Sequence, residues 1–160
     1  MLNPAPGGAA RRYTGAMMAR VRAVIDTNIV FEGLTHRGGP AGVIVSAWMA
    51  ELFQSCVSQA LAYEYEDVLA RKLAPERWAR TRLVLDALLH RAELVIAHYS
   101  WRPSSPDPGD EHVIDCAMNA RAMVVTSNLR DFELARIELH LPVLLPVDFL
   151  KLLQAETRGS

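Results

Sequence analysis

Residues 21–34 read VRAVIDTNIVFEGL, and this stretch decides how the rest of the chain is interpreted. It opens on an apolar run ending at Ile25, which predicts a buried strand. The run stops abruptly at Asp26, which is followed by Thr27 and Asn28. Because open α/β sheets present functional groups at the carboxyl ends of their strands, Asp26 is a candidate site residue. The alternative is structural, since Asp26 or Asn28 could instead cap a following turn.

Short apolar runs alternate with longer helical patterns along the rest of the chain. This alternation predicts an α/β fold, a three-layer α/β/α sandwich with a central, mostly parallel sheet. The expected strands are residues 21–25, 53–57, 94–97, 123–126 and 143–145. The expected helices are residues 40–51, 59–73, 75–91, 110–121 and 147–154, with a proline-rich loop at 100–109 and a short helical turn after 129.

Length and composition predict one domain with short tails. Of the 160 residues, 1–19 are rich in Gly, Ala, Pro and Met and predict a flexible tail, followed by a domain at 20–155 and a C-terminal tail at 156–160. The formal net charge is -1, so binding of nucleic acid would need a local basic patch. Two cysteines without metal-ligand spacing, and no apolar run of membrane length, predict a cytoplasmic protein without membrane contact.

A second candidate acid lies in SQALAYEYEDVLARKL, residues 58–73. Helical spacing puts Leu61, Tyr65 and Leu69 on one stripe of the expected helix, with Glu64 at its edge. Of the acids on this helix, Glu64 is therefore the best placed to face a cleft. A solvated glutamate at the edge of the helix is the structural alternative.

A third candidate acid is Asp110, in the first turn of the helix expected at 110–121. The spacing of small and apolar residues puts Asp110 on the buried face, whereas Glu111 and Asp115 fall well off that face. A buried carboxylate is costly without a partner, which here would be either the positive end of the helix or a metal ion.

A fourth candidate lies in AMVVTSNLRDFELA, residues 122–135. This apolar strand ends in Thr126, Ser127 and Asn128, followed shortly by Asp131, so it resembles the first strand in ending on small polar residues. The two strand ends can face the same edge of the sheet. As the alternative, Ser127 or Asn128 caps a turn and Asp131 is surface charge.

These four acids make up an oxygen-only set of candidate ligands. Hard divalent ions such as Mg²⁺ and Mn²⁺ take carboxylate and water ligands, and one or two such ions can promote cleavage of a phosphodiester bond. The catalytic and metal-binding candidates are Asp26, Glu64, Asp110 and Asp131.

In chain order these motifs resemble the PIN domain family of metal-dependent nucleases. The resemblance runs from Arg20 to about Leu153 through VIDTNI, SQALAYEYEDVLARKL, DPGDEHVIDCAMNARA, VVTSNLRDF and LPVDFL. It implies that the four acids bind the metal. It also implies that substrate, water or the ligating carboxylates are oriented by Asn28, Thr126, Ser127 and Asn128.

The same resemblance implies an endoribonuclease that uses Mg²⁺ or Mn²⁺. Such proteins are most often the toxin of a bacterial toxin–antitoxin pair of the VapC-like group, acting on RNA as a homodimer that an antitoxin protein inhibits. One departure is Asn128, where other members carry an aspartate; the site would then be one charge poorer, and Asp107 could assist. Two alternatives stay open: an inactive PIN-fold module that binds RNA or protein, and a housekeeping RNA-processing nuclease without an antitoxin.

Overall fold

The computed structural model describes residues 20–100 and 108–159. The expected N-terminal tail, residues 1–19, and the suggested role of Asp107 therefore lie outside the described residues. Within the described ranges, no helix is both long enough and apolar enough to cross a membrane.

Five parallel strands form one sheet in the order β3-β2-β1-β4-β5. Since β1 lies in the middle, its carboxyl end is flanked by the ends of β2 and β4, as expected for a site at this edge. The predicted α/β fold with a parallel sheet is confirmed. The strands are β1 (Arg22–Ile25), β2 (Gln54–Ser58), β3 (Glu93–Val95), β4 (Met123–Val125) and β5 (Val143–Leu144).

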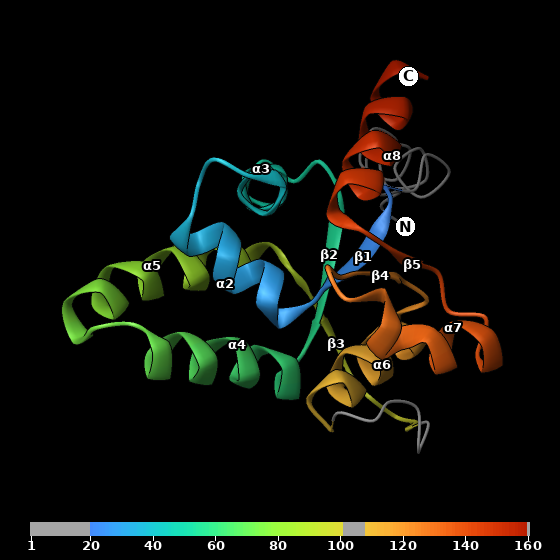
Figure 1. The fold of residues 1–160 in the computed structure, drawn as a ribbon, viewed down its shortest axis with the longest axis horizontal. Helices are drawn as coiled ribbons and strands as arrows, with labels where there is room; N and C mark the ends of the chain where they lie inside the picture. The colour runs from blue at the N-terminus through green and yellow to red at the C-terminus, as the bar shows by residue number, and fades with distance from the viewer. Residues whose placement is uncertain (1–19, 101–107, 160) are drawn as a thin grey trace, which may run out of the picture.

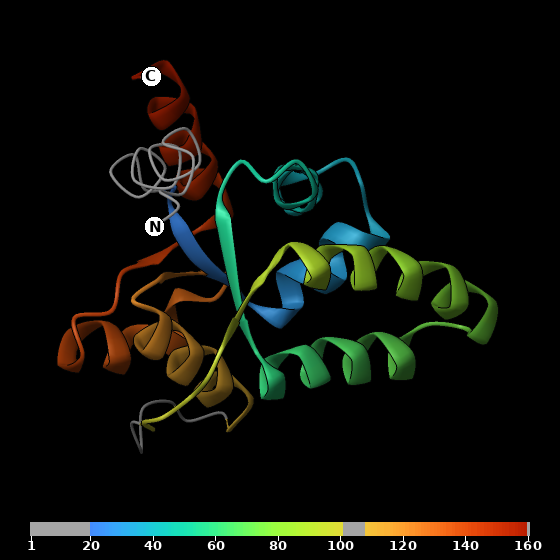
Figure 2. The same cartoon turned by 180° about the vertical axis from the view of Figure 1, so that it is seen from behind.

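Helices cover both faces of the sheet, giving the predicted three layers (Figures 1 and 2). One side carries α2 (Thr27–Thr35), α3 (Pro40–Met49), α4 (Gln59–Lys72) and α5 (Pro75–Arg91). The other side carries α6 (Pro108–Ala120) and α7 (Glu133–Glu138), the latter preceded by the 3₁₀ turn η1 (Leu129–Phe132). The last helix, α8 (Pro146–Arg158), packs against α3.

Local sequence explains where several helices begin. The Ser58 hydroxyl accepts a hydrogen bond from the Leu61 N–H at 3.2 Å and caps α4. Proline opens α3, α5 and α8, where its missing N–H costs nothing. Two features differ from the sequence-based expectation. Helix α2 was not expected, and α8 continues to Arg158, into the segment expected to be a tail.

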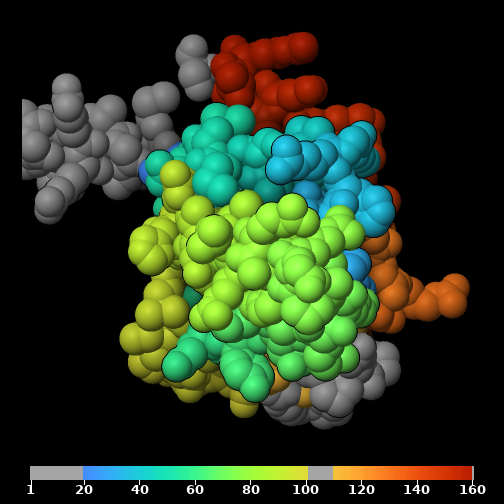
Figure 3. Space-filling model, turned by 90° about the vertical axis from the view of Figure 1, so that its left-hand side faces the viewer, coloured from blue at the N-terminus to red at the C-terminus, as the bar shows by residue number. Residues whose placement is uncertain are grey.

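Aromatic side chains tie the helices of one layer together. The Trp48 ring lies 6.4 Å from the rings of both Phe53 and Tyr65, and its indole N–H donates to the Leu88 carbonyl at 2.9 Å. Phe53 in turn meets Phe149 of α8 edge to face at 5.1 Å. Side chains of α5 cover most of this side of the molecule, with α3 above and α4 below (Figure 3). The network fixes α4, which carries Glu64, against the sheet.

Helices α2 and α3 approach each other closely at Gly33. A Cβ atom added there would lie 2.5 Å from Val45 Cγ2 and 2.6 Å from the Ala41 carbonyl oxygen. Real Cβ atoms do not make such short contacts, so the position requires glycine. Because α2 follows Asp26 directly, this contact also fixes the direction in which the chain leaves β1.

We predict that Gly33→Ala lowers the free energy of unfolding by about 1–3 kcal/mol, since the added methyl overpacks the contact between α2 and α3. Gly38→Ala is the matched control, because nothing lies within 4 Å of its added Cβ. Thermal and urea unfolding of both variants measures the difference. Equal stabilities for the two variants would contradict the close approach of the helices.

Candidate functional site

Asp26 is buried at the carboxyl end of β1, with 5% of its surface exposed. It occupies the N-cap position of α2, yet its side chain makes no capping hydrogen bond. Its Oδ2 atom instead accepts a hydrogen bond from the Thr126 hydroxyl at 2.7 Å. The carboxylate is thus oriented by the neighbouring strand and is not used to cap the helix, which argues against the structural alternative for Asp26. Asn28, in the first turn of α2, is exposed.

The pairing of β1 with β4 brings Asp26 and Thr126 together. Ile25 is in register with Val125, and the Asp26 N–H continues the ladder by donating to the Val125 carbonyl at 2.9 Å. Thr126 is fully buried, and its hydroxyl also accepts from the Asn128 N–H at 3.1 Å. One hydroxyl therefore fixes both the Asp26 carboxylate and the backbone that follows β4.

Asn128 connects this arrangement to Asp131. Its side-chain amide donates to Asp131 Oδ2 at 2.7 Å. Asn128 and Ser127 are exposed, whereas Asp131 is half-buried in η1. The amide at position 128 supplies a donor that an aspartate could not supply, so the departure from the family pattern removes a charge and holds Asp131 in place at the same time.

Glu64 and Tyr65 approach the same strand end from α4. Glu64 is half-buried, and its Oε2 atom is fully covered. Tyr65 is completely buried, and its hydroxyl donates to the carbonyl of Ile25, the residue before Asp26. Burial, followed by the charges that Cys116, Asp26 and Glu64 carry when ionised, raises the pKa of the Tyr65 phenol well above its usual value. Asp26 and Glu64 therefore both lie near this ring.

Sequence reasoning gave no role to Tyr65, although it placed the residue on the buried stripe. A buried tyrosine hydroxyl normally finds a hydrogen-bond partner, and this was the available signal. The partner is a backbone carbonyl of another element, which no pattern in the helix itself can indicate.

The expectation for α6 was wrong in part. Asp110 lies in the first turn but is only half-buried, whereas Glu111 and Asp115 are 8% and 7% exposed. The cause is the packing of α6, which contacts four strands and also α4. A helix that is enclosed on several sides has no single buried stripe. The face on which helical spacing places Asp110 is therefore not the only buried face of α6.

The donor set fits a hard divalent cation by its chemistry, because every candidate ligand is an oxygen. In residues 20–100 and 108–159, no three His, Cys, Asp or Glu side chains are grouped closely enough to hold a metal ion. Mg²⁺ keeps several water ligands and is commonly bound through one or two carboxylates, which this arrangement can supply. The buried Thr27 hydroxyl, next to Asp26, finds no hydrogen-bond partner in the described part of the chain and could accept one from such a water.

Two buried thiols, Cys56 of β2 and Cys116 of α6, lie where this helix packs on the sheet. Burial raises the pKa of Cys56 to about 11 and that of Cys116 to about 12. The Cys116 thiol donates a weak hydrogen bond to the Cys56 carbonyl, with a sulfur–oxygen distance of 3.7 Å. Both thiols are therefore protonated in the folded protein at neutral pH.

We predict that alkaline pH destabilises the fold through these thiols. In the unfolded chain they titrate near 9.0, whereas the folded chain keeps the protons up to about 11 and 12. Their contribution is complete below about pH 9 and is lost as pH rises toward the folded values. Urea midpoints between pH 8 and pH 11 should fall more steeply for the wild type than for the Cys56→Ala/Cys116→Ala variant. Identical slopes would show that the thiols contribute nothing.

We predict that Thr126→Val lowers the free energy of unfolding by about 1–3 kcal/mol, because it leaves the buried Asp26 carboxylate and the Asn128 N–H without their hydroxyl partner. Thr126→Ser keeps the hydroxyl and should lose less. Thr157→Val is the control: its hydroxyl bonds the Leu153 carbonyl at 2.8 Å on the exposed end of α8. Urea unfolding measures the stability of all three variants. If Thr157→Val lowers the free energy of unfolding as much as Thr126→Val does, the hydrogen bonds of Thr126 are no more important to stability than an exposed one.

Comparison with solved structures shows a shared fold. The chain is similar to VapBC2 from Rickettsia felis bound to a DNA fragment from its promoter, at 12% identity and a TM-score of 0.58, over 78% of this chain and 98% of that one. It is also similar to VapBC-1 from nontypeable Haemophilus influenzae, at 12% identity and a TM-score of 0.56, over 79% and 99% of the two chains. FitAB bound to an IR36 DNA fragment gives 14% identity and a TM-score of 0.53, over 78% and 94%.

Comparison of sequences gives the family. No curated protein sequence matches the chain. The family model described as PIN domain matches residues 22–130, from the start of β1 into η1. The match spans Asp26, Glu64 and Asp110 and ends one residue before Asp131. Because this segment is more than half of the chain and holds β1 to β4, which build the site, the chain belongs to the PIN domain family.

Proposed function

We propose that this protein is a metal-dependent endoribonuclease that hydrolyses phosphodiester bonds in RNA and acts as the toxin of a toxin–antitoxin pair. The observation that carries the proposal is the buried Asp26 carboxylate, which the Thr126 hydroxyl orients at the carboxyl edge of the sheet. Membership of the PIN domain family supports nuclease chemistry at this edge.

The residues proposed to hold Mg²⁺ or Mn²⁺ are Asp26, Glu64, Asp110 and Asp131. When bound, such a cation supplies Lewis acidity that makes water a better nucleophile and offsets the charge on the leaving oxygen. The same cation would neutralise carboxylates that otherwise repel one another and the phosphate.

The protein's own contribution is to hold these groups in fixed positions. Thr126 keeps the Asp26 carboxylate in one orientation, and the Asn128 amide does the same for Asp131. Fixed ligands lower the cost of reorganisation during the reaction. Asn28 and Ser127 are exposed near the same edge, where their side chains would contact the RNA phosphate or its water.

An antitoxin protein is the proposed partner. The similar structures include the VapBC and FitAB proteins, two of them bound to DNA. By the same resemblance we propose a homodimer acting in the cytoplasm. A short open reading frame beside the gene would favour the toxin assignment over the housekeeping nuclease, and sedimentation of the purified protein measures its oligomeric state.

We predict that the purified protein cuts RNA in the presence of Mn²⁺ or Mg²⁺ but not in EDTA, and that Asp26→Asn reduces cutting at least about a hundredfold. The assay uses a mixed panel of structured and single-stranded RNAs. Asp86→Asn on α5 is the matched control, since Asp86 is exposed on a helix away from the strand ends and should retain full activity.

Calorimetry with Mn²⁺ and circular dichroism accompany the assay, so that loss of activity can be separated from loss of fold. Equal cutting with and without EDTA would disprove the metal dependence. Inert wild-type protein that also fails to bind Mn²⁺ would favour the remaining alternative, an inactive PIN-fold module that binds RNA or protein.

A further inference from the structure

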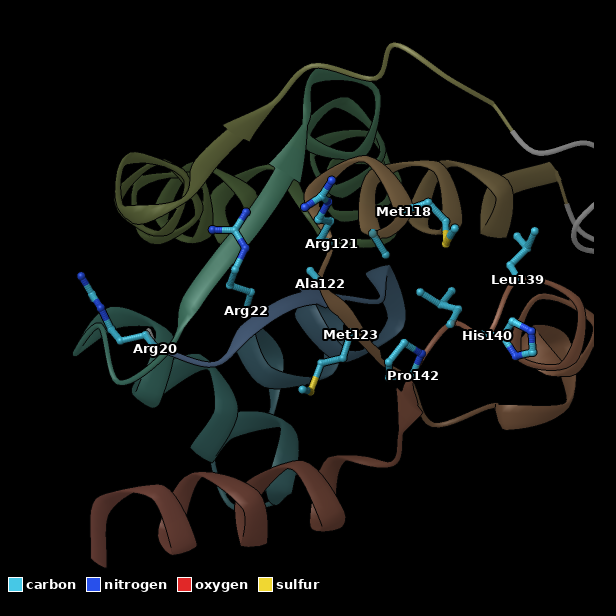
Figure 4. A pocket seen from close by; sticks show the side chains of 11 residues that line it. Arg20, Arg22, Met118, Arg121, Ala122, Met123, Leu139, His140 and Pro142 are labelled. Atoms are coloured by element: carbon cyan, nitrogen blue, oxygen red, sulfur yellow. The ribbon is translucent and has the colours of Figure 1, made fainter. Parts of the chain in front are cut away.

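A second candidate site lies at the opposite edge of the sheet. A hollow of about 470 Å³ opens there, at the amino ends of β1 and β4 (Figure 4). Its walls come from the start of β1, the end of α6, β4 and the turn after α7. Asp26 lies at the other end of β1, about 13 Å from Arg22 at the usual rise of a strand. The hollow is therefore separate from the four candidate acids.

Three arginines and one histidine line the hollow: Arg20, Arg22, Arg121 and His140. None of the described residues that line it is acidic. Arg22 is already used, because it pairs with Glu93 at 2.6 Å and donates twice to the Ala120 carbonyl at 3.2 and 3.0 Å.

Arg20 and Arg121, the other two arginines of the lining, are not neutralised by an acidic side chain of the described residues. Among the described residues, Arg20 bonds only the backbone carbonyl of Glu51, at 3.1 Å, and neither Arg20 nor Arg121 forms a salt bridge there. Since Arg22 already bonds the last carbonyl of α6, the charge of Arg121 is not needed to cap that helix.

Two of the lining residues are held in a strained backbone conformation. Arg121 has φ 53° and His140 has φ 54°, and Glu51 is the third such non-glycine residue in the described ranges. Arg121 follows α6 at a position where glycine is preferred, and the Ala122 N–H closes the turn on the Ala117 carbonyl at 2.9 Å. Glycine, which this conformation favours, would remove the side chain that each of these two positions contributes to the lining of the hollow.

The lining combines these cations with an apolar floor that includes Met118, Met123, Leu139 and Pro142. Arginine binds phosphate oxygens through its planar, charged donors, and a floor of polarisable and aliphatic side chains suits a flat heterocycle. An acidic peptide would satisfy the charge but would not need the floor.

We propose that this hollow binds a nucleotide, with Arg121 on its phosphate and the base against the apolar floor. The nucleotide can be free or one unit of an RNA chain, since both present the same chemistry. The proposal does not rest on nuclease activity, because no candidate metal ligand lines the hollow.

The test measures binding in EDTA, so that no metal-dependent cleavage interferes. The probes are adenosine 5′-monophosphate, inorganic phosphate and a short single-stranded RNA oligonucleotide. Arg121→Gly should weaken binding of the mononucleotide, the oligonucleotide or both about tenfold, and should also raise Tm, because glycine accepts the positive φ without strain. Glu51→Gly is the matched control: it relieves the same strain outside the hollow, so Tm should rise without weaker binding. Arg121→Gln, which keeps the strain, should repeat the loss of binding alone.

Each outcome decides the proposal. Binding of the mononucleotide that depends on Arg121 supports a free nucleotide as ligand, and Arg121-dependent binding of the oligonucleotide alone supports a unit of RNA. Unchanged binding in both Arg121 variants overturns the site. Inorganic phosphate that competes as well as the mononucleotide overturns the role of the apolar floor. Displacement of the RNA by poly-glutamate at equal charge would assign the hollow to an acidic protein partner instead.

Discussion

The hydrogen bond between the Thr126 hydroxyl and the Asp26 carboxylate connects the ends of two neighbouring strands, and the candidate site is built around it. Ile25 and Val125 are paired in register, so the two side chains that follow them meet at the sheet edge. Tyr65 fixes the same strand end from the other side through the Ile25 carbonyl. A buried carboxylate is costly without a hydrogen-bond partner, and here the Thr126 hydroxyl holds it in a single orientation.

The fold could be predicted because its strands are short apolar runs separated by amphipathic helices, a pattern that few architectures satisfy. Helix α2 escaped prediction because its local signals point elsewhere. Thr27 and Asn28 are typical of a turn, and Gly33 disfavours a helix interior. The helix is stabilised by tertiary contact with α3, in which the same Gly33 is required for close packing.

The candidate site was predictable where it depends on strand ends and unpredictable where it depends on packing between elements. Asp26 and Thr126 follow apolar runs, so their shared location could be read from the sequence. Glu111 and Asp115 are buried because several elements surround α6. The spacing of apolar residues along the helix gives no information on how many elements will pack against it. The bond between Asn128 and Asp131 is local, yet the side chains of a 3₁₀ turn follow no amphipathic pattern that would indicate it.

The formal net charge of the chain is only -1, yet acidic and basic side chains gather at opposite ends of β1 and β4. Asp26 and Asp131 follow the carboxyl ends of β1 and β4, whereas Arg20, Arg22 and Arg121 lie near their amino ends. A phosphate near the proposed metal ligands would be repelled by their charge unless a divalent cation offset it, while the arginine edge would attract a phosphate without any metal. Binding of a nucleotide and cleavage of RNA should therefore respond differently to removal of metal. Under the proposed functions of the two edges, the metal requirement would belong to one edge of the sheet and not to the protein as a whole.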